Sequence, residues 1–398
     1  MSKYTLKKVE NKKDIRIFLD MPMSIYRNDS MWVRPLDNDI ENVFSPQKNE
    51  LFEGGEAIRW IAFDGDKPVG RIAAFYNMEK AKVSEQLTGG CGFFECIDNQ
   101  EVANILFDAS VEWLEKRGMK AMDGSINFGD REQFWGVLIE GYDHPMYGMN
   151  YNLPYYGKLF ENYGFQNYFN QYSHRRVTKK GLFNKSVYAR VQRLSENPDY
   201  EFRPITRKEI KGVGQKFRSI YNKAWANFTG VKLMTEEQAE QFEKTLKPII
   251  NPDLIYFAYY KGEAIGFFIM LPDLNCMIKD FNGKLGIMQK LKLFYRLRVK
   301  KSYDKIQAIV FGVMPEFQGK GIESGLMMCS ENTIADKINV EYIELVWVGD
   351  FNPLMLRMVE NYVCAERCKQ HTTFRYMIDK SIEFKRAPRV SVTRKPIK

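Results

Sequence analysis

The residues best suited to chemistry form a short glycine-rich loop, Gln318-Gly319-Lys320-Gly321. An apolar run ending at Val313 precedes it, and a helical pattern begins directly after it. A strand, a glycine-rich turn and a helix N-terminus together direct several unpaired backbone N–H groups at one point, where they bind anions. Glycine permits the dihedral angles of such a turn and the close approach of the anion. The loop therefore predicts a pyrophosphate site; the alternative is that Gly321 only serves a turn.

Two other phosphate-binding patterns are not met by this loop. The Walker pattern requires Ser or Thr directly after Gly-Lys, and Gly321 stands there instead. The dinucleotide pattern G-x-G-x-x-G requires a third glycine, and Ser324 occupies its position. The loop therefore belongs to neither class.

The elements that must position this loop occur in the same order in two units, at residues 1–179 and 200–380. In the first unit, hydrophobic periodicity predicts a helix at 12–19, a hairpin at 57–77, a strand at 92–96 and a helix at 99–117. In the second it predicts a helix at 210–228, hairpin strands at 255–260 and 264–271, a strand at 306–313, a helix at 322–338, a strand at 342–348, a helix at 353–362 and a final strand at 372–378. A linker at 180–199 with a short helix at 186–194 and a basic tail at 381–398 complete the chain. The shared order predicts a structural duplication, unless two mixed α/β domains merely look alike at this level.

Composition narrows the class of protein. A length of 398 residues suits two domains of about 100–200 residues each. The net charge of +9 favours an anionic partner, but no recognition motif for nucleic acid accompanies it, so a phosphorylated small molecule fits better. No apolar run approaches the roughly 18 residues of a membrane span, and the N-terminus lacks the apolar segment of a secretory signal.

The cysteines and histidines argue against a metal site. The six cysteines include no C-x-x-C pair, and the chain has three histidines, so we expect no metal. Cys329 lies inside the helix that comes after the loop, which favours a place in the core. Reduced and mostly buried thiols are typical of the cytoplasm, where we expect the protein to be.

Residues 313–322, Val-Met-Pro-Glu-Phe-Gln-Gly-Lys-Gly-Ile, closely resemble the acyl-CoA loop of the GNAT superfamily of N-acetyltransferases. The family pattern is Q/R-x-x-G-x-G/A after a V-x-P strand end. Gln318, Gly321 and Ile322 match it, whereas Glu323 stands where Gly or Ala is usual. The likeness extends over roughly residues 201–379. It implies a mixed α/β (α+β) fold of two GNAT-like domains, each a mixed, mostly antiparallel sheet flanked by helices.

The resemblance also implies a cofactor, acetyl-CoA or another acyl-CoA. The residues implied to bind it are Val313, Gln318, Gly319, Lys320, Gly321, Ile322, Glu323, Ser324 and Asn352. The backbone N–H of Val313 or Met314 is implied as the donor to the oxyanion that develops during acyl transfer. A carboxylate at Glu323 would repel a phosphate unless it points outward as a first-turn helix acid.

Candidates for proton transfer are fewer. The resemblance implies that the pantetheine arm of the cofactor lies between the strands at 306–313 and 342–348, which splay apart in the family. Glu344 lies beside this channel, where it could act as general base through water. The alternative is a salt-bridged strand residue, and Asp350 is a second candidate for the base. Strand alternation predicts two faces: Glu344, Val346 and Val348 on one, and Ile343, Leu345 and Trp347 on the other.

The tyrosine that serves as general acid in the family has no counterpart in this sequence. Its position falls on Val359 or Glu360, and Tyr362 lies two or three residues beyond it. His371 is near in sequence, but a lone histidine is more often structural. The thiolate then leaves unaided, another group protonates it, or the domain binds acyl-CoA without transferring the acyl group.

The first unit matches the family only faintly. Residues 155–165 resemble the family's helix with a Gly-Phe ending, but the loop at 96–101 contains no glycine and two carboxylates. Such a loop cannot form the same anion site. We expect a degenerate copy that shapes the substrate site or supports the second unit.

A basic segment at residues 284–301 interrupts the second unit. It contains seven Lys and Arg residues and no acid, and Leu285, Met288, Leu291 and Phe294 or Tyr295 can share one helical face. The segment is a lid over the acceptor site, a helix at a membrane surface, or a helix whose apolar face packs on the other domain.

The sequence therefore predicts a cytoplasmic, acyl-CoA-dependent N-acyltransferase, most simply an N-acetyltransferase, that acts on a small amine-bearing molecule by direct transfer. One alternative is a non-catalytic protein that binds acyl-CoA or another ligand. Another is a transferase with a different activated donor on the same fold, such as an aminoacyl-tRNA.

Overall fold

The computed structural model describes residues 3–129, 131–225, 233–338 and 340–389. The strands of the first unit are β1 (Tyr4–Lys8), β2 (Gly55–Asp64), β3 (Lys67–Asn77), β4 (Thr88–Cys96), β5 (Ala121–Gly124), β6 (Val137–Glu140) and β7 (Gln166–Val177). Its helices are α1 (Lys12–Asp20), α2 (Pro22–Ile25), α3 (Asp37–Val43), α4 (Met78–Lys82), α5 (Gln100–Glu115) and α6 (Tyr156–Tyr163), with a single turn η1 (Glu50–Phe52).

The second unit is built from a similar set. Its strands are β8 (Tyr200–Pro204), β9 (Ile255–Tyr260), β10 (Glu263–Pro272), β11 (Lys305–Val313), β12 (Tyr342–Gly349) and β13 (Glu366–Met377). Its helices are α7 (Lys185–Ser195), α8 (Val213–Trp225), α9 (Glu236–Leu246), α10 (Asn275–Ile278), α11 (Ile287–Tyr295), α12 (Ile322–Lys337) and α13 (Pro353–Arg357). Short turns are η2 (Lys208–Ile210), η3 (Pro252–Leu254), η4 (Arg296–Lys300), η5 (Pro315–Phe317) and η6 (Met358–Tyr362).

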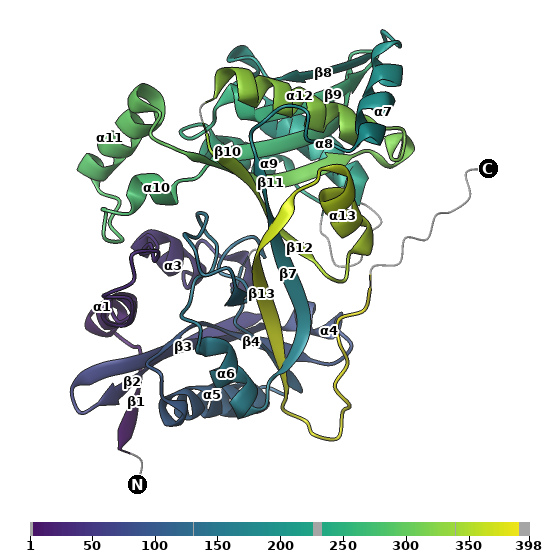
Figure 1. Cartoon of the computed structure of the whole chain (residues 1–398). Helices are drawn as coiled ribbons and strands as arrows, with labels where there is room; N and C mark the ends of the chain where they lie inside the picture. Colours follow the sequence, from purple (N-terminus) through teal and green to yellow (C-terminus); the bar gives the residue numbers. More distant parts are fainter. Residues whose placement is uncertain (1–2, 130, 226–232, 339, 390–398) are drawn as a thin grey trace.

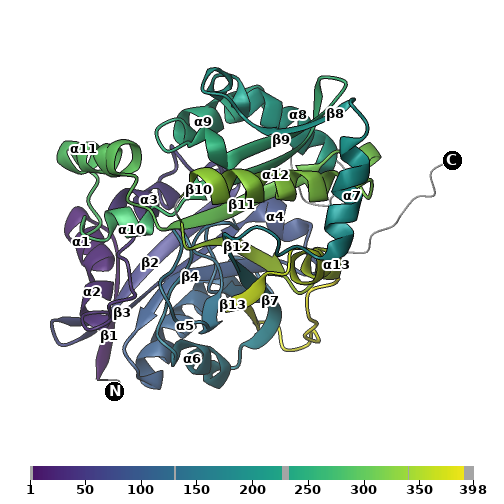
Figure 2. The same cartoon turned by 45° about the horizontal axis from the view of Figure 1, so that its top comes forward.

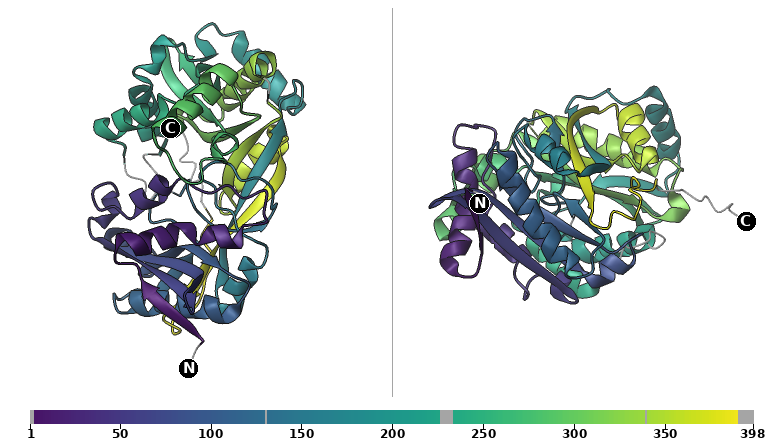
Figure 3. Two further views of the ribbon diagram at one scale, coloured as in Figure 1. Left: turned by 90° about the vertical axis from the view of Figure 1, so that its left-hand side faces the viewer. Right: turned by 90° about the horizontal axis from the view of Figure 1, so that it is seen from below.

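One sheet runs through both units. Its strand order in the described part of the chain is β1-β2-β3-β4-β5-β13-β7-β12-β11-β10-β9-β8, and β6 pairs with β13. The last strand of the second unit therefore lies between β5 and β7 of the first, and β7 lies between β13 and β12. Figure 1 shows these two long strands passing between a lower and an upper lobe, and Figure 3 shows the lobes from two further sides. Each unit contributes its final strand to the sheet of the other.

The predicted mixed α/β fold of two similar units is confirmed. Both predicted hairpins form, β2 with β3 and β9 with β10, and their turns contain Gly65 and Gly262 with positive φ. The predicted linker helix is α7. The helix predicted at 210–228 is α8; residues 226–228 lie outside the described residues.

The last strand of the first unit is β7. Its sequence is mostly polar, so hydrophobic periodicity does not predict a strand over residues 166–177. The side chains of Gln171, Ser173 and His174 in β7 are nevertheless fully buried. They lie between two other strands, so β7 has a central position without the apolar pattern that identifies buried strands. Of the predicted basic tail, residues 381–389 are described, and Ala387 donates its N–H to the carbonyl of Tyr168 at 3.0 Å.

Helices cover both faces of the second unit's sheet. Neighbouring residues of a strand point to opposite faces. In β10, Phe267 packs on Phe217 of α8, with ring centroids 4.7 Å apart, whereas Phe268 faces α12. On the α12 side, the ring of Phe202 in β8 lies so close to Gly325 that a Cβ there would meet it at 2.4 Å. This close approach fixes α12, and with it the loop at its N-terminus, against the sheet.

Candidate functional site

The glycine-rich loop joins β11 to α12 as predicted. The chain leaves Val313 through the turn η5 and reaches Gly321, which is the N-cap of α12. Gly319 has φ 73° and Gly321 has φ 96°, in the left-handed region that glycine adopts most readily. The side chain of Gln318 donates to the carbonyl of Val313 at 3.0 Å and thereby ties the two ends of the loop together.

The loop presents uncapped backbone N–H groups. The helix α12 has no side-chain cap. Within the described chain, no hydrogen-bond acceptor contacts the N–H groups of Gly319, Gly321, Ile322, Glu323 or Ser324. These groups lie in one turn of backbone and in the first turn of a helix, which is the arrangement that binds phosphate.

Two cations stand beside these N–H groups. Lys320 is exposed in the loop itself. The methylene groups of Arg190 in α7 lie against Gly321, which is buried; a Cβ there would meet Cγ of Arg190 at 2.8 Å and Leu194 at 3.2 Å. A cation at a helix N-terminus is unfavourable unless an anion lies between them. Glu323 is the one acid of this first turn, and its side chain is partly exposed.

The strands beside the loop diverge. β11 and β12 are parallel, and their pairing ends at Ala308 and Leu345 although both strands continue. A bulge occurs in each strand at that point: Ile309 is the extra residue in β11, and Val346 with Trp347 interrupts the pairing of β12 with β7. Bulges bend a strand and end its pairing. The bulges therefore open a gap between the two strands on the side of the loop.

The bulge in β12 corrects the predicted alternation. Val346 and Trp347 both pack near Met146 of the first unit. Val348 lies on the other face of the strand, where it packs with Leu345 in the apolar cluster around Met327 and Val359. The predicted faces were therefore wrong for Trp347 and Val348, because one extra residue reverses the alternation of every residue after it.

The two candidate oxyanion donors differ in their surroundings. The N–H of Met314 donates to the carbonyl of Ile265 in β10 at 2.9 Å. Successive N–H groups of a strand point to opposite edges. The N–H of Val313 is therefore directed away from β10, into the gap that β12 has left.

Glu344 lies in a buried network of charges. Its side chain is completely buried, and its two oxygens accept from Nζ of Lys369 at 2.9 and 2.8 Å. Arg175 adds a contact at 3.2 Å, and Asp143 of the first unit is 2.7 Å from the same lysine. Burial alone would lower the pKa of Lys369, but the charges of Glu344 and Asp143 raise it. This is the salt-bridged arrangement, in which Lys369 and Arg175 occupy the oxygens of Glu344.

The structure also places two titratable side chains together that the sequence analysis did not single out, His144 and Asp273. Nδ1 of His144 lies 3.9 Å from Oδ2 of Asp273, and neither atom has a hydrogen-bond partner in the described part of the chain. The other oxygen of Asp273 accepts the N–H of Tyr147, whose carbonyl accepts from Gln307 of β11. Gln307 precedes the divergence of the strands by one residue, so the pair lies close to it.

Burial shifts both groups of this pair towards neutrality. It lowers the pKa of His144 to about 4, helped by the nearby charges of Lys305 and Lys369. It also raises the pKa of Asp273 to about 6. At neutral pH the ring is therefore uncharged and lies next to a carboxylate. The sequence carried no signal for this pair, because its members come from different units.

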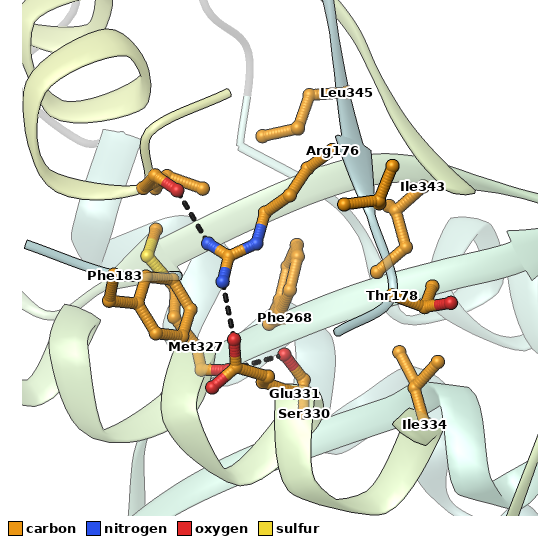
Figure 4. A pocket seen from close by; sticks show the side chains of 12 residues that line it. Arg176, Thr178, Phe183, Phe268, Met327, Ser330, Glu331, Ile334, Ile343 and Leu345 are labelled. Carbon is orange, nitrogen blue, oxygen red and sulfur yellow. Dashed lines mark hydrogen bonds and ion pairs between the residues drawn. The ribbon is translucent and has the colours of Figure 1, made fainter. Parts of the chain in front are cut away.

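An apolar cavity of about 40 Å³ lies between α12 and β12 (Figure 4). It begins at Leu345, where the strands diverge. The side chains that line it include Phe183, Phe268, Met327, Ile334, Ile343 and Leu345. Its main polar feature is an ion pair between Arg176 and Glu331, and Arg176 also donates to the carbonyl of Val363.

The helix after β12 differs from its prediction. The residues expected to form one α-helix, 353–362, form α13 and then the π-helical turn η6. Val359 is buried, and Glu360 pairs with Arg367 at 2.6 Å. Arg190 lies 5.6 Å from the ring centroid of Tyr362, on the side of the loop. A π-helical turn has more residues than an α-helical turn, so residues 358–362 point in other directions than a continuous α-helix would give them.

The remaining predicted residues have structural contacts. Asn352 caps α13 by accepting the N–H of Met355 at 3.2 Å. Ile322 is fully buried in the core, and Ser324 is buried in the first turn of α12. His371 is also buried, with its ring nitrogen 2.9 Å from the carbonyl of Asn150. No group of His, Cys, Asp and Glu in the described ranges is placed to hold a metal ion.

The first unit closes the corresponding place with its own side chains. Asn99 caps α5 by accepting the N–H of Val102 at 3.1 Å. At the end of β4, Tyr155 donates to the carbonyl of Cys96 at 2.6 Å, and the hydroxyl of Tyr156 accepts the N–H of Cys96 at 3.1 Å. Side chains of the first unit therefore bond groups of this loop that are backbone-only in the second unit.

Known proteins resemble almost the whole sequence, although no known family model matches it. Over 359 residues the chain is 28% identical to the bacterial ceramide synthase of Caulobacter vibrioides, a match that covers 89% of this chain and 92% of that protein. It is 25% identical to the protein YghO of Escherichia coli over 375 residues, 92% of this chain and 94% of the relative.

Among solved structures, a tandem GNAT protein from the clavulanic acid biosynthesis pathway matches 94% of this chain and 98% of its own, with a TM-score of 0.52 and 10% identity. The chain has the tandem GNAT fold. The likeness predicted from the loop is thereby confirmed at the level of fold. In the present chain, the free N–H groups lie in the second unit.

Proposed function

We propose that this chain is an N-acyltransferase that moves an acyl group from coenzyme A to a primary amine. The observation that carries the proposal is the set of uncapped N–H groups of Gly319 and of Gly321 to Ser324, in the loop that follows β11 after its divergence from β12. The diphosphate of coenzyme A matches these donors and the charges of Lys320 and Arg190. When bound, acyl-CoA supplies an acyl group activated as a thioester.

The proposed position of the acyl donor is the gap between the strands. The thioester carbonyl would lie where the strands begin to diverge, next to Ala308 and Leu345. Val313 is five residues further along β11, so its N–H faces the part of the gap next to the loop rather than that carbonyl. The apolar cavity that begins at Leu345 would hold the first carbons of an acyl chain. Asn352 would act through the helix that it caps rather than by direct contact.

The pair of His144 and Asp273 is the proposed base. The amine must lose a proton as it attacks, and an uncharged imidazole next to a carboxylate takes it up. Their separation of 3.9 Å is longer than a hydrogen bond, as is common before substrates bind. Since no tyrosine occupies the family's acid position, the same imidazolium would give the proton to the departing thiolate of coenzyme A.

The acceptor that we propose is a long-chain amino alcohol. A relative that matches almost the whole chain is named a bacterial ceramide synthase, and a ceramide is the fatty amide of such an alcohol. This class replaces the small amine as the first substrate to test. We also propose that the protein works in the cytoplasm, since its six cysteines are free thiols.

The test combines a fatty acyl-CoA with a long-chain amino alcohol and measures both thiol release and the amide product, the latter by mass spectrometry. Lys320→Glu replaces a cation of the loop with an acid and should raise the KM for acyl-CoA at least tenfold. Lys158→Glu, an exposed lysine on α6 of the first unit, makes the same change of charge and should leave the KM unchanged. Equal KM values for the two variants would remove the loop from the proposal.

The alternatives give different results in the same experiment. Calorimetric binding of acyl-CoA without thiol release across short and long amines would identify a binding protein. Absence of binding for acetyl-CoA and longer acyl-CoAs would end the acyl-CoA proposal and leave a different activated donor.

A further inference from the structure

The helix α11 and the turn η4 carry an apolar surface that the rest of the described chain does not cover. None of the residues of α11 is buried. The exposed apolar side chains are Ile287 at 79%, Met288 at 73%, Leu291 at 60%, Phe294 at 59%, Tyr295 at 54% and Val299 at 64%. Of the face expected to pack on the other domain, Leu285 does so beside Val33 and Leu36, whereas Met288, Leu291 and Phe294 are exposed. Figures 1 and 2 show α11 at the margin of the molecule, above α10.

The opposite side of the same helix is firmly attached. Leu297 is buried, and Leu293 packs against the core of the second unit. Arg296 donates to Asp280 at 2.6 Å, and Arg298 donates to the carbonyl of Ile250 at 3.0 Å. These contacts fix the orientation of the helix, so its apolar face is held outward.

The attachment also reaches the first unit. The N–H of Asp37 donates to the carbonyl of Gly283, just before α11, at 2.8 Å. Val33 and Leu36 pack with Phe281 beneath the same segment. Both units therefore support the base of α11, which makes the exposed face a feature of the assembled fold.

Cations surround the apolar face. Lys284, Lys290, Lys300 and Lys301 are exposed, and none of them makes an ion pair within the described chain. No acidic residue occurs between Lys284 and Lys301 in the sequence. An apolar helix face bordered by lysines is complementary to a bilayer that contains anionic lipids, because the side chains enter the interface while the ammonium groups contact the headgroups.

We propose that α11 and η4 dock this protein on the surface of an anionic lipid bilayer. The helix would lie in the plane of the interface, with Leu291 and Phe294 directed into the acyl region. No helix of the described chain is long and apolar enough to span a membrane. This docking goes beyond the proposed function, and it is tested in the absence of acyl-CoA and amine.

The test is co-sedimentation of the full chain with vesicles of phosphatidylcholine, with and without phosphatidylglycerol. We expect binding to the vesicles with phosphatidylglycerol that is at least tenfold tighter and that weakens in high salt. The double variant L291D/F294D should lose at least tenfold in binding, and K284E/K290E should lose the preference for phosphatidylglycerol. Val83→Asp changes an equally exposed apolar residue of the first unit and should bind as the parent does.

Three outcomes would overturn the proposal. One is that the parent chain fails to bind the anionic vesicles. Another is that L291D/F294D binds as tightly as the parent, with the same melting temperature. The third is that sedimentation without lipid shows a dimer that L291D/F294D abolishes, which would assign this face to a second copy of the chain.

Discussion

At the scale of single residues, the site depends on the absence of a side-chain cap at the start of α12. Gly321 occupies the N-cap with φ 96° and contributes no side chain, so the first N–H groups of the helix stay without an acceptor in the described chain. The equivalent helix α5 begins with Asn99, whose side chain caps it. The two helices thus differ at the N-cap, and the glycine leaves the first N–H groups of α12 without a side-chain cap.

The proposed base makes a prediction at the same scale. His144→Gln should lower kcat about 100-fold while leaving acyl-CoA affinity unchanged, because the ring takes up a proton but does not contact the diphosphate. Steady-state kinetics and calorimetry measure the two effects. A variant with the kcat of the parent would exclude this histidine.

The same pair sets the expected pH dependence. With the pKa of Asp273 at about 6 and that of His144 at about 4, the pair has a carboxylate and a neutral ring above pH 6. As the pH falls through 6 and then 4, first the carboxylate and then the ring takes up a proton, so kcat should fall over this range. In Asp273→Asn the fall near pH 6 should disappear.

At the scale of elements, two bulged strands create the gap. Parallel strands that pair along their whole length leave no room between them, and here Ile309 and Val346 with Trp347 end the pairing early. The cavity under α12 begins at the same point. The elements around the loop therefore leave space for a thin apolar chain beyond the phosphate site.

A substitution in the cavity tests this arrangement. Ile343→Phe fills part of the cavity of about 40 Å³ and should lower the ratio of rates with palmitoyl-CoA and acetyl-CoA about tenfold, since a long chain no longer fits. Ile343→Val is the matched control and should keep the ratio of the parent. An unchanged ratio in Ile343→Phe would place the acyl chain elsewhere.

At the scale of the whole molecule, the units share their final strands. β13 of the second unit pairs with β5 and β7 of the first, and β7 pairs with β12 of the second. The proposed base also joins the units, since His144 and Asp273 come from opposite sides of the linker. The predicted linker at residues 180–199 separates the two units along the sequence. In space the units share one sheet, because each needs the final strand of the other.

Truncation tests this sharing. A chain ending at residue 365 lacks β13 and exposes the edges of β5 and β7, so it should fail to give a cooperative melting transition. A chain ending at residue 380 keeps β13. It loses the exposed ion pair of Arg386 with Asp350, which is worth at most about 1 kcal/mol, and the hydrogen bond from Ala387 to Tyr168. Its melting temperature, measured by calorimetry, should stay close to that of the parent. Cooperative melting of the shorter chain would contradict the shared-strand account.

Local rules determined much of this protein from its sequence. The hairpin turns, the helix α12 and the loop before it result from glycine positions and apolar spacing, which depend on neighbours in the chain. The resemblance of residues 313–322 to a known loop then indicated the fold, which the structure has. The cations of residues 284–301 were visible in the same way.

Only the tertiary structure decided the faces of β12, the partners of Glu344 and the contact of His144 with Asp273, because these features depend on which distant segments of the chain meet. Pairing of β12 with β7 and β11 decides where each bulge falls, and the bulge reverses the faces of Trp347 and Val348. The same packing buries Glu344 between Lys369 and Arg175 and brings His144 next to Asp273. It also leaves the apolar side of α11 uncovered. Periodicity shows that a helix has an apolar face, but only the assembled fold decides whether another part of the chain lies against it.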